Sequence, residues 1–192
     1  MPSQLWLIRH GETDWTLSGA HTGRTDLPLT DTGRGRALKL RESLAVHRFA
    51  LVLISPLSRA RETCNLAGLG RIAQIEPNLV EWRYGDYEGR TTAQIQAEAP
   101  SWSLWRSGVP NGEKIAEVAS RANCVICRAL RADGDVALFG HGHMLRILGA
   151  RWLGLAPECG RLFALDTAAI GVLGYDRDGR VISRWNANAP CE

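Results

Sequence analysis

The chain has 192 residues, of which 45% are hydrophobic and 22% are charged, close to the averages of folded proteins. This composition excludes intrinsic disorder, collagen and a coiled coil as the dominant state, and the length favours a single domain over residues 1–192. The formal net charge of +3 is too small to predict nucleic-acid binding, which usually needs a strongly basic surface.

Short apolar runs that end in turn residues predict buried strands, and the amphipathic stretches between them predict helices. In chain order the expected strands cover residues 5–8, 50–54, 72–75, 136–139, 168–174 and 181–185. The expected helices cover residues 31–47, 58–69, 91–98, 113–131 and 142–153. The apolar positions expected on the first helix are Leu38, Leu40, Leu44 and Val46. Strands that alternate with helices of this length are typical of an α/β domain with a largely parallel sheet.

The five cysteines form an odd set without the spacing of a disulfide framework, which favours a reducing cytoplasm. Cys124 and Cys127 form a C-x-x-C pair inside a helical pattern, and we expect buried helix-face residues rather than a redox or zinc site. The first residues lack the basic and long apolar segments of a leader. No apolar run approaches the roughly 20 residues that span a bilayer. We therefore expect a cytoplasmic protein with no membrane partner.

Two histidines follow predicted strands in nearly identical contexts, His10 in Arg-His-Gly and His141 in Gly-His-Gly. The loops at the carboxyl ends of parallel strands meet in one crevice, so these histidines are expected to face each other. Arg59 also follows a strand, and the glycines Gly11 and Gly142 allow backbone amides to approach a bound group. Two imidazoles and two guanidiniums, those of Arg9 and Arg59, predict a pocket for a phosphoryl group.

A histidine can attack phosphorus directly and form a phosphohistidine, provided that the attacking nitrogen is unprotonated and the other nitrogen donates to a backbone carbonyl. Charge on the phosphoryl oxygens would then be neutralised by Arg9, Arg59 and a protonated His141. The leaving alkoxide needs a proton from a carboxylic acid. Glu81, Asp86 and Glu88 are the candidates, and their spacing does not decide among them.

Five ordered sequence blocks resemble the histidine phosphatase superfamily, in its phosphoglycerate-mutase-like branch. They are 7–15 (LIRHGETDW), 21–30 (HTGRTDLPLT), 55–63 (SPLSRARET), 81–89 (EWRYGDYEG) and 140–143 (GHGH). The resemblance spans roughly residues 5–185. It implies a three-layer α/β/α sandwich around a six-stranded, mostly parallel sheet, with neither metal nor cofactor.

The same resemblance assigns roles to residues of this sequence. It implies that His10 accepts the phosphoryl group, that Glu81 donates and later accepts the proton, and that Arg9, Arg59 and His141 form the phosphate pocket. The residues expected to contact substrate are Gly11, Thr16, Thr22, Gly23, Tyr84, Gly142 and His143.

Two departures separate this chain from the mutases of that branch. The mutases carry an arginine where this chain has Trp82, and they carry a paired-arginine segment that grips the substrate carboxylate; residues 102–113 stand in its place here. Without that clamp, water should receive the phosphoryl group. The chain is therefore expected to be a phosphatase that acts on a small sugar or metabolite phosphate.

Several alternatives stay open at this point. A cofactor-dependent phosphoglycerate mutase and a non-catalytic phosphate-binding regulatory module are the competing functions. Trp102 and Trp105 belong either to the core or to a lid, and Arg83 and Arg106 are candidates for the rim of the site. Glu12 is expected to orient the loop around His10. The oligomeric state is open, with a homodimer among the options.

Overall fold

A computed structural model describes residues 4–188 of the chain. It contains a six-stranded sheet in the order β3-β2-β4-β1-β5-β6. The strands are β1 (Leu5–Arg9), β2 (Leu51–Ile54), β3 (Ala73–Ile75), β4 (Val136–Gly140), β5 (Ile170–Asp176) and β6 (Gly179–Ala187). Strands β1 to β4 pair in parallel, whereas β5 is antiparallel to both β1 and β6. The fold is the expected phosphoglycerate-mutase-like α/β sandwich.

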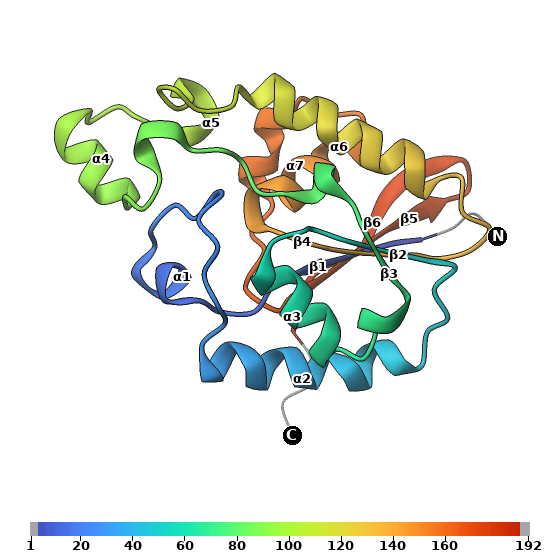
Figure 1. The fold of residues 1–192 in the computed structure, drawn as a ribbon. Coiled ribbons are helices and arrows are strands. Elements are labelled where there is room, and N and C mark those ends of the chain that lie inside the picture. The colour runs from blue at the N-terminus through green and yellow to red at the C-terminus, as the bar shows by residue number, and fades with distance from the viewer. Residues whose placement is uncertain (1–3, 189–192) are drawn as a thin grey trace.

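Helices cover both faces of the sheet (Figure 1). They are α1 (Asp14–Ser18), α2 (Asp31–Ala45), α3 (Ser58–Leu66), α4 (Thr92–Glu98), α5 (Leu104–Ser107), α6 (Ile115–Ala129) and α7 (Gly142–Trp152). Helices α2 and α3 lie on one face and α6 and α7 on the other, while α4 and α5 extend beyond the sheet. Successive side chains of β1 point to opposite faces of the sheet. Leu5 and Leu7 pack in the core under α6 and α7, and Trp6 and Ile8 pack in the core under α2 and α3.

Two of the four apolar positions expected on the first long helix, α2, are exposed, and the period of the helix explains why. On α2 the buried side chains are Ala37, Leu40 and Leu44, whereas Leu38 is 49% and Val46 80% exposed. Leu38 lies one residue past the buried stripe and Val46 follows the last helical turn, so both point to water.

The prediction of buried cysteines on α6 was also wrong, because Cys124 and Cys127 are both exposed. The buried stripe of that helix includes Val118, Ala122 and Val125, and its 3.6-residue period leaves the two thiols on the outer side. Cys64 is a buried residue of α3, and Cys191 lies outside the described residues.

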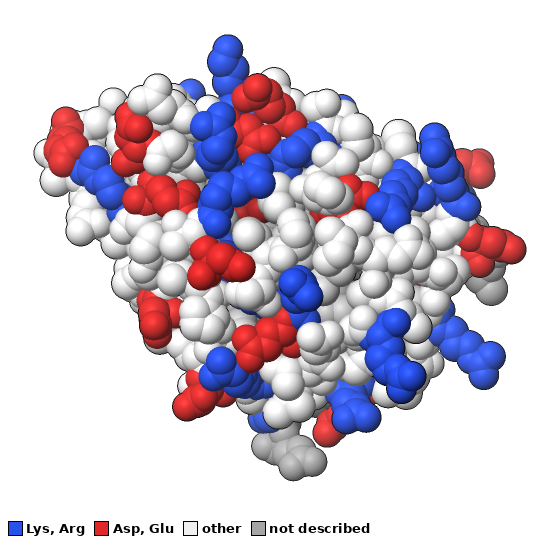
Figure 2. Space-filling model, viewed as in Figure 1, with Lys and Arg blue, Asp and Glu red and all other residues white. Residues whose placement is uncertain are grey.

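Trp102 belongs to the core, with 6% of its surface exposed, and Trp105 packs against that core. This resolves the choice between core and lid in favour of the core. Lys and Arg side chains alternate with Asp and Glu over the face shown in Figure 2, without a broad area of one sign. Among the described residues, no helix is long and apolar enough to cross a membrane.

Candidate active site

Parallel pairing of β1 with β4 brings the two histidine loops together. Arg9 lies opposite Gly140 at the carboxyl ends of these strands, and the His10 amide donates to the Gly140 carbonyl over 3.0 Å. The ring centroids of His10 and His141 are consequently 5.1 Å apart. This is the convergence at one crevice that the parallel-sheet argument predicts.

His10 is held as a neutral imidazole with one defined free nitrogen. Its Nδ1 is 2.7 Å from the Gly11 carbonyl oxygen. Because a carbonyl can only accept, Nδ1 carries the proton and Nε2 is the bare nitrogen. Burial, followed by the Arg59 and Arg9 guanidiniums, holds the pKa of His10 well below its usual range. This is the protonation state that a nucleophile needs.

The structure contradicts a protonated His141. Its Nδ1 accepts a hydrogen bond from Arg59 Nε at 3.2 Å, and its Nε2 lies 2.8 Å from Ser55 Oγ. An imidazolium has no acceptor for the arginine, and burial and Arg59 hold the pKa of His141 well below its usual range. His141 is therefore a neutral, completely buried side chain that connects Arg59 to the end of β2.

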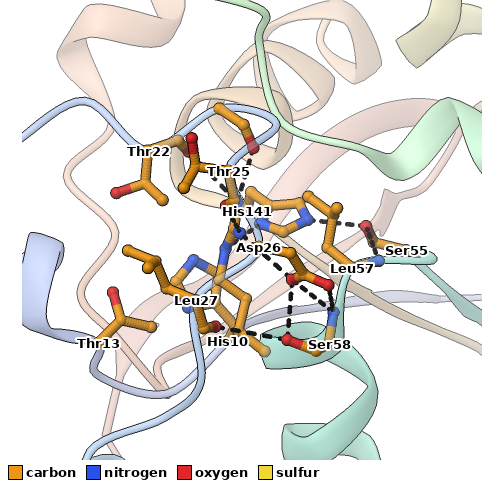
Figure 3. A network of polar contacts seen from close by, with 12 residues as sticks. His10, Thr13, Thr22, Thr25, Asp26, Leu27, Ser55, Leu57, Ser58 and His141 are labelled. Carbon is orange, nitrogen blue, oxygen red and sulfur yellow. Dashed lines mark hydrogen bonds and ion pairs between the residues drawn. The ribbon is translucent and has the colours of Figure 1, made fainter. Parts of the chain in front are cut away.

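Arg59 orders the loop that contains Thr22 and Thr25, two residues labelled in Figure 3. From the first turn of α3, its guanidinium donates to the carbonyls of Thr22, Gly23 and Thr25 at 2.9–3.3 Å. A second contact attaches the same loop to the start of α3, because the Asp26 carboxylate accepts hydrogen bonds from both the amide and the hydroxyl of Ser58. The phosphate contact expected of Arg59 is thus replaced by backbone contacts.

A cavity of about 290 Å³ opens beside His10. The predicted residues that line it are Arg9, His10, Thr16, Thr22, Glu81, Tyr84, Gly142 and His143. Arg59 and His141 lie behind this wall, as do the two predicted glycines Gly11 and Gly23.

Those two glycines serve packing instead of substrate contact. A Cβ on Gly11 would lie 2.7 Å from the carbonyl oxygen of Gly33 in α2, so the close approach of α2 requires a glycine at position 11. The Gly11 amide donates a hydrogen bond to the Thr63 hydroxyl. The Gly23 amide donates to the Glu88 carboxylate over 2.8 Å. Gly142 does line the cavity, and a Cβ on it would meet the Arg9 guanidinium at 3.3 Å.

Glu81 is the carboxylate of the three candidates that reaches the cavity. It is 4% exposed, and its oxygens accept from the backbone amides of Trp82, His143 and Met144 at 2.9–3.0 Å. The last two amides belong to the first turn of α7, so the start of this helix fixes the Glu81 side chain at the cavity.

The other two carboxylates have different partners. Glu88 accepts from the Gly23 and Thr25 amides and so fixes the loop, and the exposed Asp86 accepts from Asn111. Glu12 accepts from the Thr30 hydroxyl at the start of α2, consistent with a loop-orienting role.

The segment before Glu81 is anchored by an ion pair that the sequence analysis missed. Arg121 of α6 contacts the Glu113 carboxylate at 2.7 and 2.9 Å and also donates to the carbonyls of Asn78 and Val80. Both side chains are largely buried. This ion pair fixes the backbone just before Glu81. Glu113 and Arg121 are eight residues apart, on either side of the start of α6, and this spacing matches no motif that would have predicted the pair.

Arg9 and Leu165 of the loop before β5 both line the cavity. One Arg9 Nη donates to the Leu165 carbonyl at 2.6 Å, and the buried Nε–H has no hydrogen-bond partner among the described residues. The other Nη has no partner in residues 4–188 either, so the guanidinium keeps a free donor at the cavity, which suits an anionic ligand.

The cavity wall also includes His143, Tyr84 and a residue that the sequence did not single out, Arg146. The Tyr84 hydroxyl is 2.6 Å from His143 Nδ1, and burial, reinforced by the Glu81 charge, keeps the pKa of that phenol well above its usual range. Arg146 lies over the Trp105 ring at 4.7 Å and donates to the Gly160 and Arg161 carbonyls. Arg146 lies four residues after Gly142 and therefore on the same face of α7, and this spacing could have predicted that it lines the cavity.

The two rim candidates do not line this cavity. Arg83 donates to the Asn111 and Gly112 carbonyls, and Arg106 lines a separate hollow beside α5. Within residues 4–188, no three His, Cys, Asp or Glu side chains form a group that could hold a metal ion.

Comparisons with known proteins identify relatives over nearly the whole chain. A sequence model of the histidine phosphatase superfamily (branch 1) matches residues 5–188. The chain is 40% identical over 184 residues to an acid phosphatase of Mycobacterium tuberculosis, a match that covers 94% of this chain and 90% of that protein. It is 35% identical over 186 residues to the sedoheptulose 1,7-bisphosphatase of Saccharomyces cerevisiae, covering 79% and 68% respectively.

Among solved structures, the product of a Mycobacterium tuberculosis open reading frame superposes with a TM-score of 0.94. The two chains are 38% identical, and the match covers 99% of this chain and 100% of that one. The sequence and the structure comparisons therefore both find similar proteins over nearly the whole chain.

Proposed function

The chain belongs to branch 1 of the histidine phosphatase superfamily and is a phosphatase, and from this premise we propose that it hydrolyses phosphomonoesters through a phosphohistidine on His10. The observation that carries the proposal is the hydrogen bond from His10 Nδ1 to the Gly11 carbonyl. That bond leaves Nε2 unprotonated in a cavity that also contains Glu81 and Arg9. A nucleophile, an acid and a cation around one hollow are the parts that phosphoryl transfer requires.

In the first step, His10 Nε2 forms a bond to phosphorus while the bond from phosphorus to the leaving oxygen breaks. Glu81 in its acid form gives its proton to that oxygen, and the alcohol departs. Arg9, with free donors beside His10, stabilises the charge on the phosphoryl oxygens.

In the second step, water attacks phosphorus and the bond to Nε2 breaks. The Glu81 carboxylate takes a proton from that water, which restores the acid form, and inorganic phosphate leaves. His10 returns to the neutral state in which it began. No metal or cofactor takes part in either step.

We propose a small sugar or metabolite phosphate as the substrate. The cavity of about 290 Å³ is small, and its wall mixes cations with hydroxyl and aromatic groups, which suits a polar phosphate ester. The name of the yeast relative, a sedoheptulose 1,7-bisphosphatase, supports the same class.

Hydrolysis is favoured over mutase transfer because residues 102–113 add no arginine to this cavity. Arg106 is the arginine of that stretch, and it lines the separate hollow beside α5. An assay with 3-phosphoglycerate plus 2,3-bisphosphoglycerate tests this choice. Phosphate release is expected to exceed mutase turnover, and the reverse ratio would assign the chain to the mutases.

Trapping the intermediate tests the proposed mechanism. Mixing the enzyme with a ³²P-labelled sugar phosphate and quenching in alkali is expected to leave label on His10, because phosphohistidine survives base. The His10→Asn variant is expected to carry no label, and mass spectrometry locates the modified residue in the wild type. Label on another residue would refute the role of His10, and p-nitrophenyl phosphate left intact would indicate a non-catalytic binding module.

A further inference from the structure

A second and larger cavity, of about 490 Å³, lies directly beside the reaction cavity. It opens between α1, α2 and the loop before β5, and its wall includes Arg36 and Lys39 of α2 and Asp166 of the loop. The two cavities share Arg9 and Thr16 as wall residues. The two cavities therefore adjoin at Arg9 and Thr16.

The cations of this second cavity have hydrogen-bonding capacity to spare. Lys39 forms no hydrogen bond or ion pair with any other residue in the described part of the chain. Arg36 has only distant partners, the Thr167 hydroxyl at 3.4 Å and the Glu12 carboxylate at 4.0 Å. Because they lie three residues apart on α2, both side chains project from the same face of the helix.

The carboxylates in the same wall are already engaged. Glu12 accepts the Thr30 hydroxyl over 2.8 Å, and Asp166 accepts the side-chain amide of Asn186 over 3.0 Å. Arg9, between the two cavities, has a buried Nε–H without a partner among residues 4–188. The wall thus carries three cations, those of Arg9, Arg36 and Lys39, against two carboxylates. Arg36 and Lys39 have donors left over, and this pattern fits an anionic ligand.

We propose that this cavity binds the second phosphate of a sugar bisphosphate whose first phosphate is transferred to His10. The proposal deepens the proposed function and rests on it for the orientation of the substrate. Arg36 and Lys39 hold the distal phosphate, and Arg9 lies between the two anionic groups. They act as specificity-determining residues, because a monophosphate reaches His10 without contacting them.

Kinetics with matched substrates test this subsite. The substrates are fructose 1,6-bisphosphate, fructose 6-phosphate and p-nitrophenyl phosphate, and the variant is the double substitution Arg36→Gln, Lys39→Gln. Losing two charge-assisted contacts is expected to raise KM for the bisphosphate by about 10- to 100-fold. Values of kcat/KM for the two monoesters are expected to stay within about twofold.

The matched control is Arg41→Gln, which removes a charge from the same helix at an exposed position that lines neither cavity. It is expected to leave all three substrates unchanged. An unchanged KM for the bisphosphate in the double variant overturns the proposal. An equal loss on all three substrates also overturns it, because that result indicates a general effect of charge on the site.

Direct binding separates failure of the subsite from failure of the proposed function. If the wild type hydrolyses none of the three substrates, the proposed function has failed. Calorimetry with fructose 1,6-bisphosphate then still tests the subsite, since binding needs no turnover. A Kd weakened about 10-fold or more by the double substitution, with fructose 6-phosphate unaffected, supports the subsite, and equal Kd values refute it.

Discussion

The loops after β1 and β4 carry nearly the same residues, Arg-His-Gly and Gly-His-Gly, and give their histidines different chemistry. His10 has one nitrogen bonded to its own neighbour's carbonyl and lines the cavity. His141 has both nitrogens in contact with side chains, those of Arg59 and Ser55, and lies behind the cavity wall. The partners of each ring nitrogen, and not the flanking glycines, therefore determine which histidine can act as the nucleophile.

Replacing each histidine in turn tests most directly whether His10 and His141 have different roles. His10→Ala removes the attacking nitrogen, and we expect kcat for p-nitrophenyl phosphate to fall by on the order of 10⁴-fold or more. Steady-state phosphate release measures this loss, and circular dichroism shows whether the fold is kept. A variant with more than about one tenth of wild-type activity would contradict the assignment.

Glu81→Gln tests the acid that serves His10. The amide cannot give a proton to a leaving alkoxide, so we expect a loss of about 10²–10⁴-fold in kcat with a sugar phosphate. With p-nitrophenyl phosphate, whose phenolate leaves without a proton, the loss should be below about 10-fold.

The ratio between these two losses is the decisive quantity, because it cancels any general damage to the site. Glu88→Gln is the matched control, since Glu88 binds the loop amides and lies outside the cavity wall. It is expected to affect both substrates equally. Equal losses in Glu81→Gln would remove Glu81 from the role of acid.

His141→Gln sharpens the contrast with His10. The substitution takes away the Nδ1 acceptor of Arg59, so the loop at residues 22–25 loses part of its support. We expect a loss of about 10- to 100-fold in kcat/KM while His10 still becomes phosphorylated. Quench-trapping of the phosphoenzyme measures this, and absence of label in the variant would mean that His141 takes part in the transfer itself.

The smallest expected effect is on how the free energy of unfolding depends on pH. Burial holds the pKa values of His10, His141 and His143 well below 6.5 in the folded protein. Below pH 6.5 the unfolded chain therefore binds protons that the folded chain does not, and the free energy of unfolding decreases as pH falls. The limiting slope is about 1.4 kcal/mol per pH unit for each histidine.

Urea unfolding at pH 7.5, 6.5 and 5.5 measures this dependence. We expect His141→Gln to lose less stability than the wild type between pH 6.5 and 5.5, by about 1 kcal/mol, because one of the three histidine titrations is gone. His47→Gln, on a half-buried ring beside Trp6 outside the site, is the control. Identical slopes in wild type and His141→Gln would show that His141 titrates normally in the folded state.

The sequence predicts the fold well because the patterns that define strands and helices are local. The expected strand at residues 136–139 differs from β4 by one residue. The strand expected from Ala168 begins instead at Ile170, because Ala168 has a φ of 56° and lies outside the ladder. Such backbone turns depend on tertiary contacts, and the apolar run does not reveal them.

The site is less predictable because residue type does not fix the direction of a side chain. The sequence places Arg59 after a strand, but its donors point to three loop carbonyls that are 34–37 residues away along the chain. The pairing of Arg121 with Glu113 and the exposure of Arg146 to the cavity likewise depend on how helices pack. Glu81 could be separated from Asp86 and Glu88 only once the first turn of α7 was seen beside it.

The order of the sheet also has a consequence for synthesis of the chain. Strand β1 leaves the ribosome well before its two neighbours, β4 and β5, which end at residues 140 and 176. Until then both edges of this apolar strand are unpaired, which exposes the nascent chain to association with other chains or chaperones. A chain halted near residue 130 already contains His10 and Glu81 but has neither β4 nor α7 to bring them together. Catalytic competence therefore arises only after β4 and α7 have been synthesised.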